Sequence, residues 1–391
     1  MATRTELRWN CWPDEADHLL LTTILHEDEG IARAAWNAAV DLLDMDAPSF
    51  EQERQFGLLA RRLAVIAPDD PHLRTLRAAA RRTSAQNLVN LAAIDSVVSM
   101  FDDAGIEFVV LKGVALLLSV FDNLSLRPIA DLDLLVRPEQ HRRAIDLLGA
   151  AGWIADRDHL GNHAVGMFGP PIAVDLHRSV SQELGSPMVS ENGWGTFAVV
   201  ESQGALPSGR HVPILAPTDA LVHTILHGLQ WNGPIVLRWV TDAAELLRSG
   251  AIDEDRLVHL SALFSVSPVI RDALLYIDEV TGGVVEPSML RRLRSAPTPR
   301  LELLRLRAFH ERPTPDGVAP PLGVSLSRFL HRTTGETLPG SLRLVPAFLM
   351  QPFEASNWRE LLRKLVGEAV VRVGHAIGGT DARIDGGSES S

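Results

Sequence analysis

The sequence contains a single cysteine, Cys11, among its 391 residues. One cysteine excludes an intrachain disulfide and a cysteine-based zinc cluster, which fits a reducing compartment. The chain also lacks an N-terminal signal pattern and a long uncharged apolar run, because charges interrupt its apolar stretches within a few turns. We therefore expect a soluble, cytoplasmic protein with no membrane partner.

Lysine is nearly absent, since Lys112 and Lys364 are the only two and arginine supplies the other positive charges. The formal net charge of −12 argues against a nucleic-acid partner, because proteins that bind duplexes or tRNA are usually basic. A small partner molecule is favoured. An arginine-rich stretch around Arg61, Arg62 and 74–82 could contact an anionic partner, but a solvated helix face is the favoured explanation.

A hydrophobic content of 46% in a chain of this length is ample for two or three domains. Apolar residues at three-and-four spacing predict a helical region over residues 1–100, and short alternating runs predict an α+β core over 101–216. A second helical region follows over 217–377. The Gly/Ser/Asp composition of 378–391 predicts a disordered tail. The expected fold class is thus α+β, with a small mixed sheet flanked by helices.

Within these regions the apolar patterns and the turn residues predict individual elements. The expected helices cover residues 32–43, 56–66, 76–101, 114–121, 138–150, 220–229, 237–249, 254–265 and 268–281. The expected strands cover residues 107–111, 132–136, 153–155, 164–168 and 172–176. Thr218 and Asp219 suggest a helix N-cap, and the four prolines of 312–322 predict a loop.

Two carboxylates interrupt the apolar run 131–136, which reads Asp131-Leu-Asp133-Leu-Leu-Val. On a strand, residues two apart project from the same face, so both carboxylates point to one side and the leucines to the other. Such a pair is stabilised by a cation, and oxygen ligands favour Mg²⁺ or Mn²⁺ over zinc. The alternative, in which one aspartate caps a helix and the other faces water, is weakened because strand interiors are depleted in aspartate.

A third carboxylate lies in the alternating run 172–177, where Asp175 and His177 share a face. If this strand pairs with the strand that carries Asp131 and Asp133, three carboxylates converge. Three carboxylates are enough to hold two metal ions for in-line attack on a phosphate.

Lys112 stands where this chain otherwise uses arginine, and Gly113 follows it at the start of an apolar helix. A lysine beside a helix N-terminus can bind phosphate, although a solvated lysine next to a turn glycine is the simpler alternative. Arg127, just before Pro128 and the carboxylate strand, is either a phosphate clamp or a surface loop residue.

The order of these motifs resembles the uncharacterised nucleotidyltransferase family of the polymerase-beta-like superfamily. The resemblance rests on Lys112-Gly113, Arg127-Pro128, the Asp131-x-Asp133 run and the distal Val-Asp175-Leu-His177 strand. Downstream, 215–219, His223-x-x-x-His227 and 237–247 are similar to the helical region that follows the catalytic core, so the match covers roughly residues 88–286. Members of this family are bacterial proteins often associated with biosynthetic gene clusters.

The resemblance implies that a nucleoside triphosphate donates a nucleoside monophosphate to a small-molecule or peptide acceptor, with loss of pyrophosphate. It implies that Asp131, Asp133 and Asp175 bind the catalytic Mg²⁺ or Mn²⁺ ions and that Asp175 helps to deprotonate the acceptor. Lys112, Gly113 and Arg127 would face the triphosphate. His177 and His227 would approach the acceptor.

The sequence departs from better-known superfamily members, in which Gly-Ser or Gly-Gly opens the helix and the interval to the aspartates is shorter. Here Val114 follows Gly113, so backbone N–H groups and Lys112 would have to bind the phosphates. Two alternatives remain open: a non-catalytic regulator or antitoxin-like binding module of the same fold, and a glycosyltransferase, since Asp-x-Asp also binds metal-bound sugar nucleotides.

His223 and His227 lie one helical turn apart, a spacing that can bind zinc. A zinc protease of the His-Glu-x-x-His type is excluded, because Thr224 replaces the glutamate and no third ligand is evident. The histidines either pack inside the helical region or face the cleft. Trp239, beside Arg238, is expected in the core, with base stacking as the alternative.

Overall fold

The computed structural model describes residues 12–156, 164–180, 193–229, 236–264 and 266–296, together with residues 359 and 363. The loop expected at 312–322, the tail at 378–391 and most of the helical region expected beyond residue 296 lie outside these residues. Within the described ranges, no helix combines the length and the apolarity needed to cross a membrane.

A seven-stranded mixed sheet forms the centre of the fold, in the order β3-β4-β5-β2-β1-β7-β6. β1 pairs antiparallel with β2 and parallel with β7, while β2 pairs parallel with β5. The strands are β1 (Phe108–Val110), β2 (Asp131–Val136), β3 (Ile154–Ala155), β4 (Ala164–Phe168), β5 (Ala173–His177), β6 (Val199–Glu201) and β7 (Pro213–Leu215). The mixed α+β fold expected from the sequence is confirmed.

Helices precede, interrupt and follow the sheet in the chain. Those before it are α1 (Glu15–Leu25), α2 (Glu29–Ala39), α3 (Phe50–Glu53), α4 (Phe56–Ile66) and α5 (Leu73–Asp103). Those within its sequence are α6 (Lys112–Leu117), the 3-10 turn η1 (Pro138–Gln140), α7 (His141–Ala150) and α9 (Gly193–Thr196). Those after it are α10 (Pro217–Gly228), α11 (Arg238–Arg248), α12 (Glu254–Leu263), α13 (Ser267–Thr281) and α14 (Pro287–Ser295).

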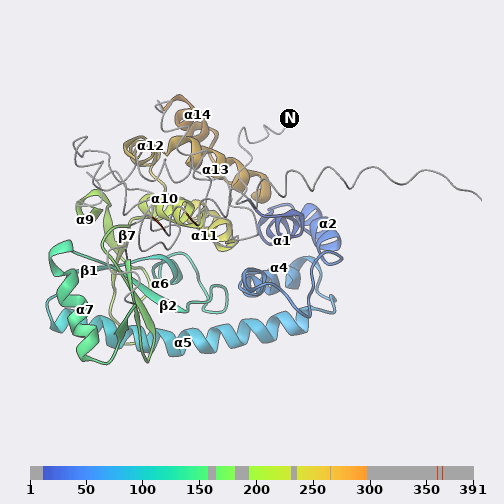
Figure 1. The fold of residues 1–391 in the computed structure, drawn as a ribbon. Coiled ribbons are helices and arrows are strands. Elements are labelled where there is room, and N and C mark those ends of the chain that lie inside the picture. The colour runs from blue at the N-terminus through green and yellow to red at the C-terminus, as the bar shows by residue number, and fades with distance from the viewer. Residues whose placement is uncertain are drawn as a thin grey trace, which may run out of the picture.

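Two apolar clusters hold these parts together. One lies between the sheet and the last turns of α5, where Phe101 packs edge-on against Phe108 with ring centroids 5.9 Å apart. The other joins the N-terminal helices to the C-terminal ones, so that Trp36 and Trp239 belong to the same core. In Figure 1 the long helix α5 runs beneath both the sheet and the N-terminal helices. The N-terminal helices, the sheet and the C-terminal helices, which are far apart in the sequence, therefore pack together.

The structure corrects the expected cap of α10. The helix begins at Pro217 with Ala216 as its N-cap, because proline is favoured in the first turn, where its missing N–H is not needed. Thr218 and Asp219 bind other segments instead: Thr218 Oγ1 accepts a hydrogen bond from the Asp253 amide, and Asp219 accepts one from the Ala198 amide. The predicted cap at these two residues is wrong.

Candidate active site

The site is built on the pairing of β2 with β5. These strands run parallel, and their register places Asp133 directly beside Asp175 and Leu135 beside His177. The expected pairing of the two carboxylate-bearing strands is therefore confirmed. Because alternate residues share a face, Asp131 and Asp133 project to the same side, while Leu132 between them enters the core.

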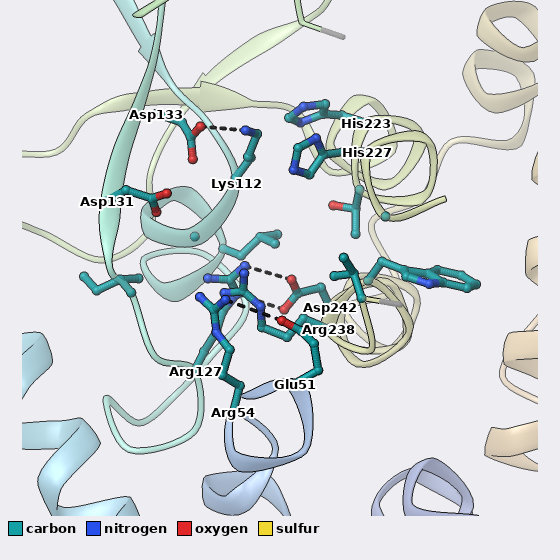
Figure 2. A pocket seen from close by; sticks show the side chains of 17 residues that line it. Glu51, Arg54, Lys112, Arg127, Asp131, Asp133, His223, His227, Arg238 and Asp242 are labelled. Carbon is teal, nitrogen blue, oxygen red and sulfur yellow. Dashed lines mark hydrogen bonds and ion pairs between the residues drawn. The ribbon is translucent and has the colours of Figure 1, made fainter. Parts of the chain in front are cut away.

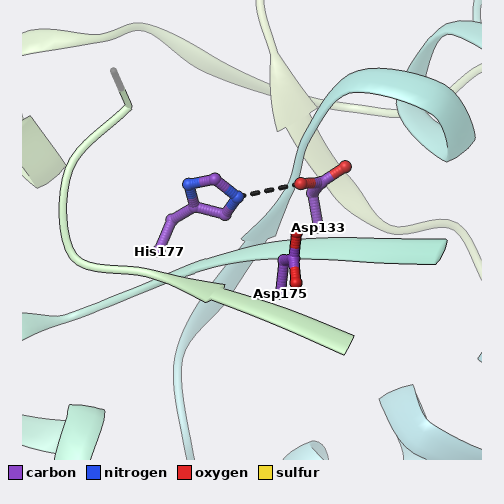
Figure 3. A group of neighbouring side chains, drawn as sticks. All are labelled: Asp133, Asp175 and His177. Carbon is purple, nitrogen blue, oxygen red and sulfur yellow. Dashed lines mark hydrogen bonds and ion pairs between the residues drawn. The ribbon is translucent and has the colours of Figure 1, made fainter. Parts of the chain in front are cut away.

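Three potential metal ligands meet at this pairing (Figure 3). One ligand atom each of Asp133, Asp175 and His177 lies within 4.8 Å of the others. Asp131 lies two residues earlier, beside Ala173, and is exposed to solvent rather than part of this group. The structure thus gathers two of the three expected carboxylates and adds the imidazole that we had placed on the acceptor side.

Lys112 reaches into the same group from the first position of α6. Its ammonium nitrogen lies 2.6 Å from Asp133 Oδ1 and 3.5 Å from His177 Nε2, and His177 Nε2 donates to the same carboxylate at 2.8 Å. Burial by itself would raise the pKa of Asp133, but the charge of Lys112 and the His177 hydrogen bond hold it well below its usual value. Asp133 is therefore ionised at neutral pH, despite being only 3% exposed.

Asp131 experiences the opposite balance. Although Asp131 is open to solvent on one side, the groups packed around its carboxyl raise its pKa by desolvation. The negative charge of Asp133 raises it further, and Lys112 partly offsets both. The two aspartates of the same strand are therefore not equivalent. An additional positive charge on this face would favour the ionised form of Asp131.

The residues present fit a divalent cation. Two carboxylates and one imidazole with ligand atoms within 4.8 Å supply oxygen donors typical of Mg²⁺ and Mn²⁺ sites, and one nitrogen donor. Asp133 is already held by two donors, which orient it as partner groups orient ligands in metal centres.

A pocket opens from this group toward the helices (Figure 2). In the figure, Asp131, Asp133 and Lys112 lie at one end and the side chains of Arg54, Arg127 and Arg238 gather at the other. The pocket is lined by Glu51, Arg54, Lys112, Gly113, Leu116, Arg127, Ile129, Asp131, Asp133, His223, Thr224, His227, Gly228, Val236, Arg238, Trp239 and Asp242. Its walls thus come from β2 and the segment before it, from α6, from α3 and the residue that follows it, and from α10, α11 and the segment just before α11.

Arg127 turns into the protein and is therefore not a surface loop residue. Its Nε and Nη2 each donate to one oxygen of Asp242 at 2.8 Å, and the residue is 5% exposed. Asn87 on α5 fixes the loop that carries it: its amide donates to the Leu124 and Arg127 carbonyls and accepts from the Ile129 amide. A buried asparagine with these three bonds sets the path of the chain into β2.

His223 and His227 face the pocket from α10, with ring centroids 5.8 Å apart. Burial, followed by the nearby positive charge of Lys112, lowers the pKa of His223 to about 3 and holds that of His227 well below its ordinary value. Both rings are therefore neutral at physiological pH. A neutral ring can accept or donate one hydrogen bond at each nitrogen but adds no charge to the pocket.

Two pocket residues, Glu51 and Arg54, are not predicted from the sequence. They belong to a helical region whose apolar spacing predicts helices only. The local signal is the capping box of Ser49 and Gln52, which marks the start of α3 but not the direction of the next side chains. Only the packing of this segment against α11 brings them to the pocket, where Glu51 accepts a hydrogen bond from the Leu237 amide.

Comparison with known proteins gives one family match for this chain. A family described as uncharacterised nucleotidyltransferase matches residues 50–282, which include all the pocket residues. No curated protein matches the chain. Two solved structures are similar in part. One is the antibiotic-resistance factor ANT(2'')-Ia, which is 12% identical in sequence; the match covers 46% of this chain and 91% of that chain, with a TM-score of 0.33. The other is an antigenic nucleotidyltransferase-like protein from Paracoccidioides brasiliensis, which is 16% identical in sequence; the match covers 55% of this chain and 96% of that chain, with a TM-score of 0.36.

The family match spans more than half of the chain and includes β2, β5 and the start of α6. The two structural likenesses are too low in identity and TM-score to add to it. The chain belongs to the uncharacterised nucleotidyltransferase family.

Proposed function

We propose that the protein transfers a nucleoside monophosphate from a nucleoside triphosphate to a small-molecule or peptide acceptor and releases pyrophosphate. The observation that carries this proposal is the register of β2 and β5, which sets Asp133 beside Asp175 within reach of Lys112. A paired carboxylate site next to a cationic side chain suits a reaction that moves phosphate groups.

We assign metal binding to Asp131, Asp133 and Asp175, with His177 as a further ligand. A bound Mg²⁺ or Mn²⁺ would neutralise phosphate charge as it develops. The side chains themselves prepare the site, because Lys112 and His177 keep Asp133 ionised. The raised pKa of Asp131 is consistent with a position that gains from positive charge.

We assign Lys112, Gly113 and Arg127 to the donor phosphates. Gly113 allows the chain to pass close to the guanidinium group, since a Cβ at this residue would lie 2.8 Å from Arg127 Nη1 and 3.3 Å from Ile129 Cγ2. A side chain at this position would therefore fill the space between α6 and Arg127. The glycine keeps backbone and guanidinium donors accessible from the same part of the pocket.

In the transfer step, an acceptor hydroxyl or amine forms a bond to the α-phosphorus while the bond to the bridging oxygen breaks. Pyrophosphate leaves, and the acceptor proton passes to a carboxylate oxygen of Asp175 and then to solvent. His227 would contact the acceptor across the pocket as a neutral group. His177 donates a hydrogen bond to Asp133 through Nε2, so besides offering a ligand atom it positions that carboxylate.

The test measures thermal stability against a panel of nucleoside triphosphates, with and without Mg²⁺ or Mn²⁺. A ligand at about 100 times its Kd stabilises the folded state by roughly 2.7 kcal/mol. We expect a metal-dependent gain with at least one triphosphate in the wild type and none in Asp133→Asn. Arg82→Gln, an exposed change on α5, serves as a control that should keep the gain.

One observation favours a second candidate, a binding module without catalysis. Lys112 already neutralises Asp133 without a metal ion, so the buried carboxylate is compatible with a purely structural ion pair. This alternative predicts no metal-dependent stabilisation by any triphosphate. It also predicts that partner binding survives the Asp133→Asn change.

A further inference from the structure

Three arginines converge at the end of the pocket opposite Asp131, Asp133 and Lys112 (Figure 2). Arg54 follows α3, Arg127 precedes β2, and Arg238 is the first residue of α11. They come from three separate parts of the chain, so no local sequence motif combines them. Their guanidinium groups share this end of the pocket with the carboxylates of Glu51 and Asp242.

The hydrogen-bonding capacity of these arginines is not used up. Arg127 spends its Nε and Nη2 on Asp242, but its buried Nη1 has no hydrogen-bond partner among the described residues. The buried Nε of Arg238 also lacks one within the described part of the chain. Buried donors are almost always satisfied in native proteins, so two unpaired guanidinium donors beside one pocket indicate an absent acceptor.

The charges of these residues also indicate an anion-binding site. Three guanidinium groups face two carboxylates, one of which, Asp242, is held by Arg127. Arg54 lies 3.5 Å from Glu51, which also binds the Leu237 amide. Burial, and then repulsion from Arg127 and Arg54, lowers the pKa of Arg238 to about 10, so the group stays charged at neutral pH. The cluster therefore carries an excess positive charge inside the protein.

We propose that Arg54, Arg127 and Arg238 form an anion subsite that binds a phosphate group and is separate from the Asp133, Asp175 and His177 metal group. A terminal phosphate presents three oxygens, one for each guanidinium group, whereas a carboxylate presents two. This inference deepens the proposed transfer and rests on it for the source of the phosphate. That source is either the triphosphate tail of the donor or a phosphorylated acceptor.

The subsite is tested by calorimetric titration of inorganic phosphate and inorganic pyrophosphate into the full-length protein in EDTA. We expect binding in the wild type that Arg54→Gln and Arg238→Gln each weaken at least tenfold, equivalent to about 1.4 kcal/mol. Arg127 is left intact because its removal would strand the buried charge of Asp242. Arg82→Gln removes the same charge from the exposed face of α5 and should bind both anions as the wild type does.

Arg238→Lys separates charge from geometry, since lysine keeps the charge but lacks the fork; it should bind more weakly than the wild type and more tightly than Arg238→Gln. Thermal unfolding of each variant identifies any that does not fold, and the remaining pocket variants then decide the outcome. The proposal is overturned if the wild type binds neither anion at millimolar concentration. It is also overturned if the folded pocket variants bind like Arg82→Gln.

Competition distinguishes the two sources of the phosphate. If a nucleoside triphosphate displaces inorganic phosphate, the arginines bind the donor tail; if phosphate binds beside the triphosphate, they bind an acceptor. Because EDTA removes divalent metal, this experiment does not depend on Asp133 or on transfer. A protein that binds phosphate but shows no Asp133-dependent stabilisation by metal and triphosphate would keep the anion subsite and lose the proposed function.

Discussion

The ammonium group of Lys112 lies 2.6 Å from Oδ1 of Asp133, while the backbone of Lys112 has a φ of 51°. Among the described residues, Lys112 is the one non-glycine residue with positive φ. A left-handed conformation is unfavourable for a residue with a Cβ, so the surrounding structure must enforce it. The strained residue is also the one that supplies charge to the buried carboxylate, which joins backbone strain to the candidate site.

Replacing Lys112 should separate its strain from its charge. Lys112→Gly and Lys112→Ala both remove the ammonium group, but only glycine adopts positive φ without steric cost. We expect Lys112→Gly to be more stable than Lys112→Ala by about 1 kcal/mol, measured by urea denaturation at neutral pH. Equal stabilities of the two variants would show that the backbone relaxes without cost.

Metal binding should depend unequally on the carboxylates. Asp175 belongs to the group whose ligand atoms lie within 4.8 Å, whereas Asp131 lies outside it. We expect Asp175→Asn to weaken Mn²⁺ binding to the free protein about tenfold or more, and Asp131→Asn to weaken it less. Calorimetric titration with Mn²⁺ measures both. The opposite order would move the metal site toward Asp131.

The stability of the protein should fall in mild acid because His223 is buried in its neutral form. Its folded-state pKa of about 3 lies below the unfolded value of about 6.5, so the unfolded state binds more protons between these values. The contribution of His223 is complete above pH 6.5 and is lost as the pH falls toward 3. It should amount to a loss of about 2 kcal/mol at pH 5.

His223→Gln should remove this part of the pH dependence, as measured by denaturation at pH 7.5 and pH 5. His259→Gln is the matched control, because His259 is exposed on α12. A His223→Gln protein that loses as much stability between these pH values as the wild type would contradict the assignment.

The packing of α10 against α11 should not tolerate a methyl group at Gly228. A Cβ there would lie 2.1 Å from Cβ and 2.3 Å from Cγ of Trp239, which is 2% exposed. We expect Gly228→Ala to destabilise the protein by about 3 kcal/mol in thermal or urea unfolding. The change should also disturb the pocket wall that both helices form.

Gly149→Ala provides the contrast, since a Cβ at this α7 residue would meet nothing within 4 Å. Alanine is the better helix former, so this variant should be as stable as the wild type or more stable by about 0.5–1 kcal/mol. A similar destabilisation in both variants would show that replacing a helical glycine, rather than the clash with Trp239, lowers the stability of Gly228→Ala.

Local patterns predicted most of the secondary structure. The predicted bounds of α4 and β4 match the structure, and β2 and β5 differ by one residue. In such segments the spacing of apolar residues follows from the burial of one face, so the local sequence is enough to predict them. The three-residue strands β6 and β7 were not predicted individually, because three residues carry too little periodicity. Their order comes from strand pairing, in which β7 pairs with β1 and β6 pairs with β7.

The site divides in the same way. Asp131, Asp133, Asp175 and Lys112 stand out in the sequence because each is a charged residue next to a strand pattern. The sequence could not show whether the two strands pair, so the position of Asp133 beside Asp175 could be predicted only on the assumption that they do. Strand pairing depends on contacts between distant segments. The ion pair between Arg127 and Asp242, 115 residues apart, could not be read from the motifs.

The sequence by itself determined the α+β fold class, the face of β2 that carries the aspartates and the family resemblance, because these depend on residue type and short-range spacing. Tertiary structure alone decided that His177 lies beside Asp133 and Asp175, that Lys112 neutralises Asp133 and that Arg54 reaches the pocket. These features depend on how helices and strands from distant parts of the chain pack, and the free energy of that packing is not contained in any local pattern.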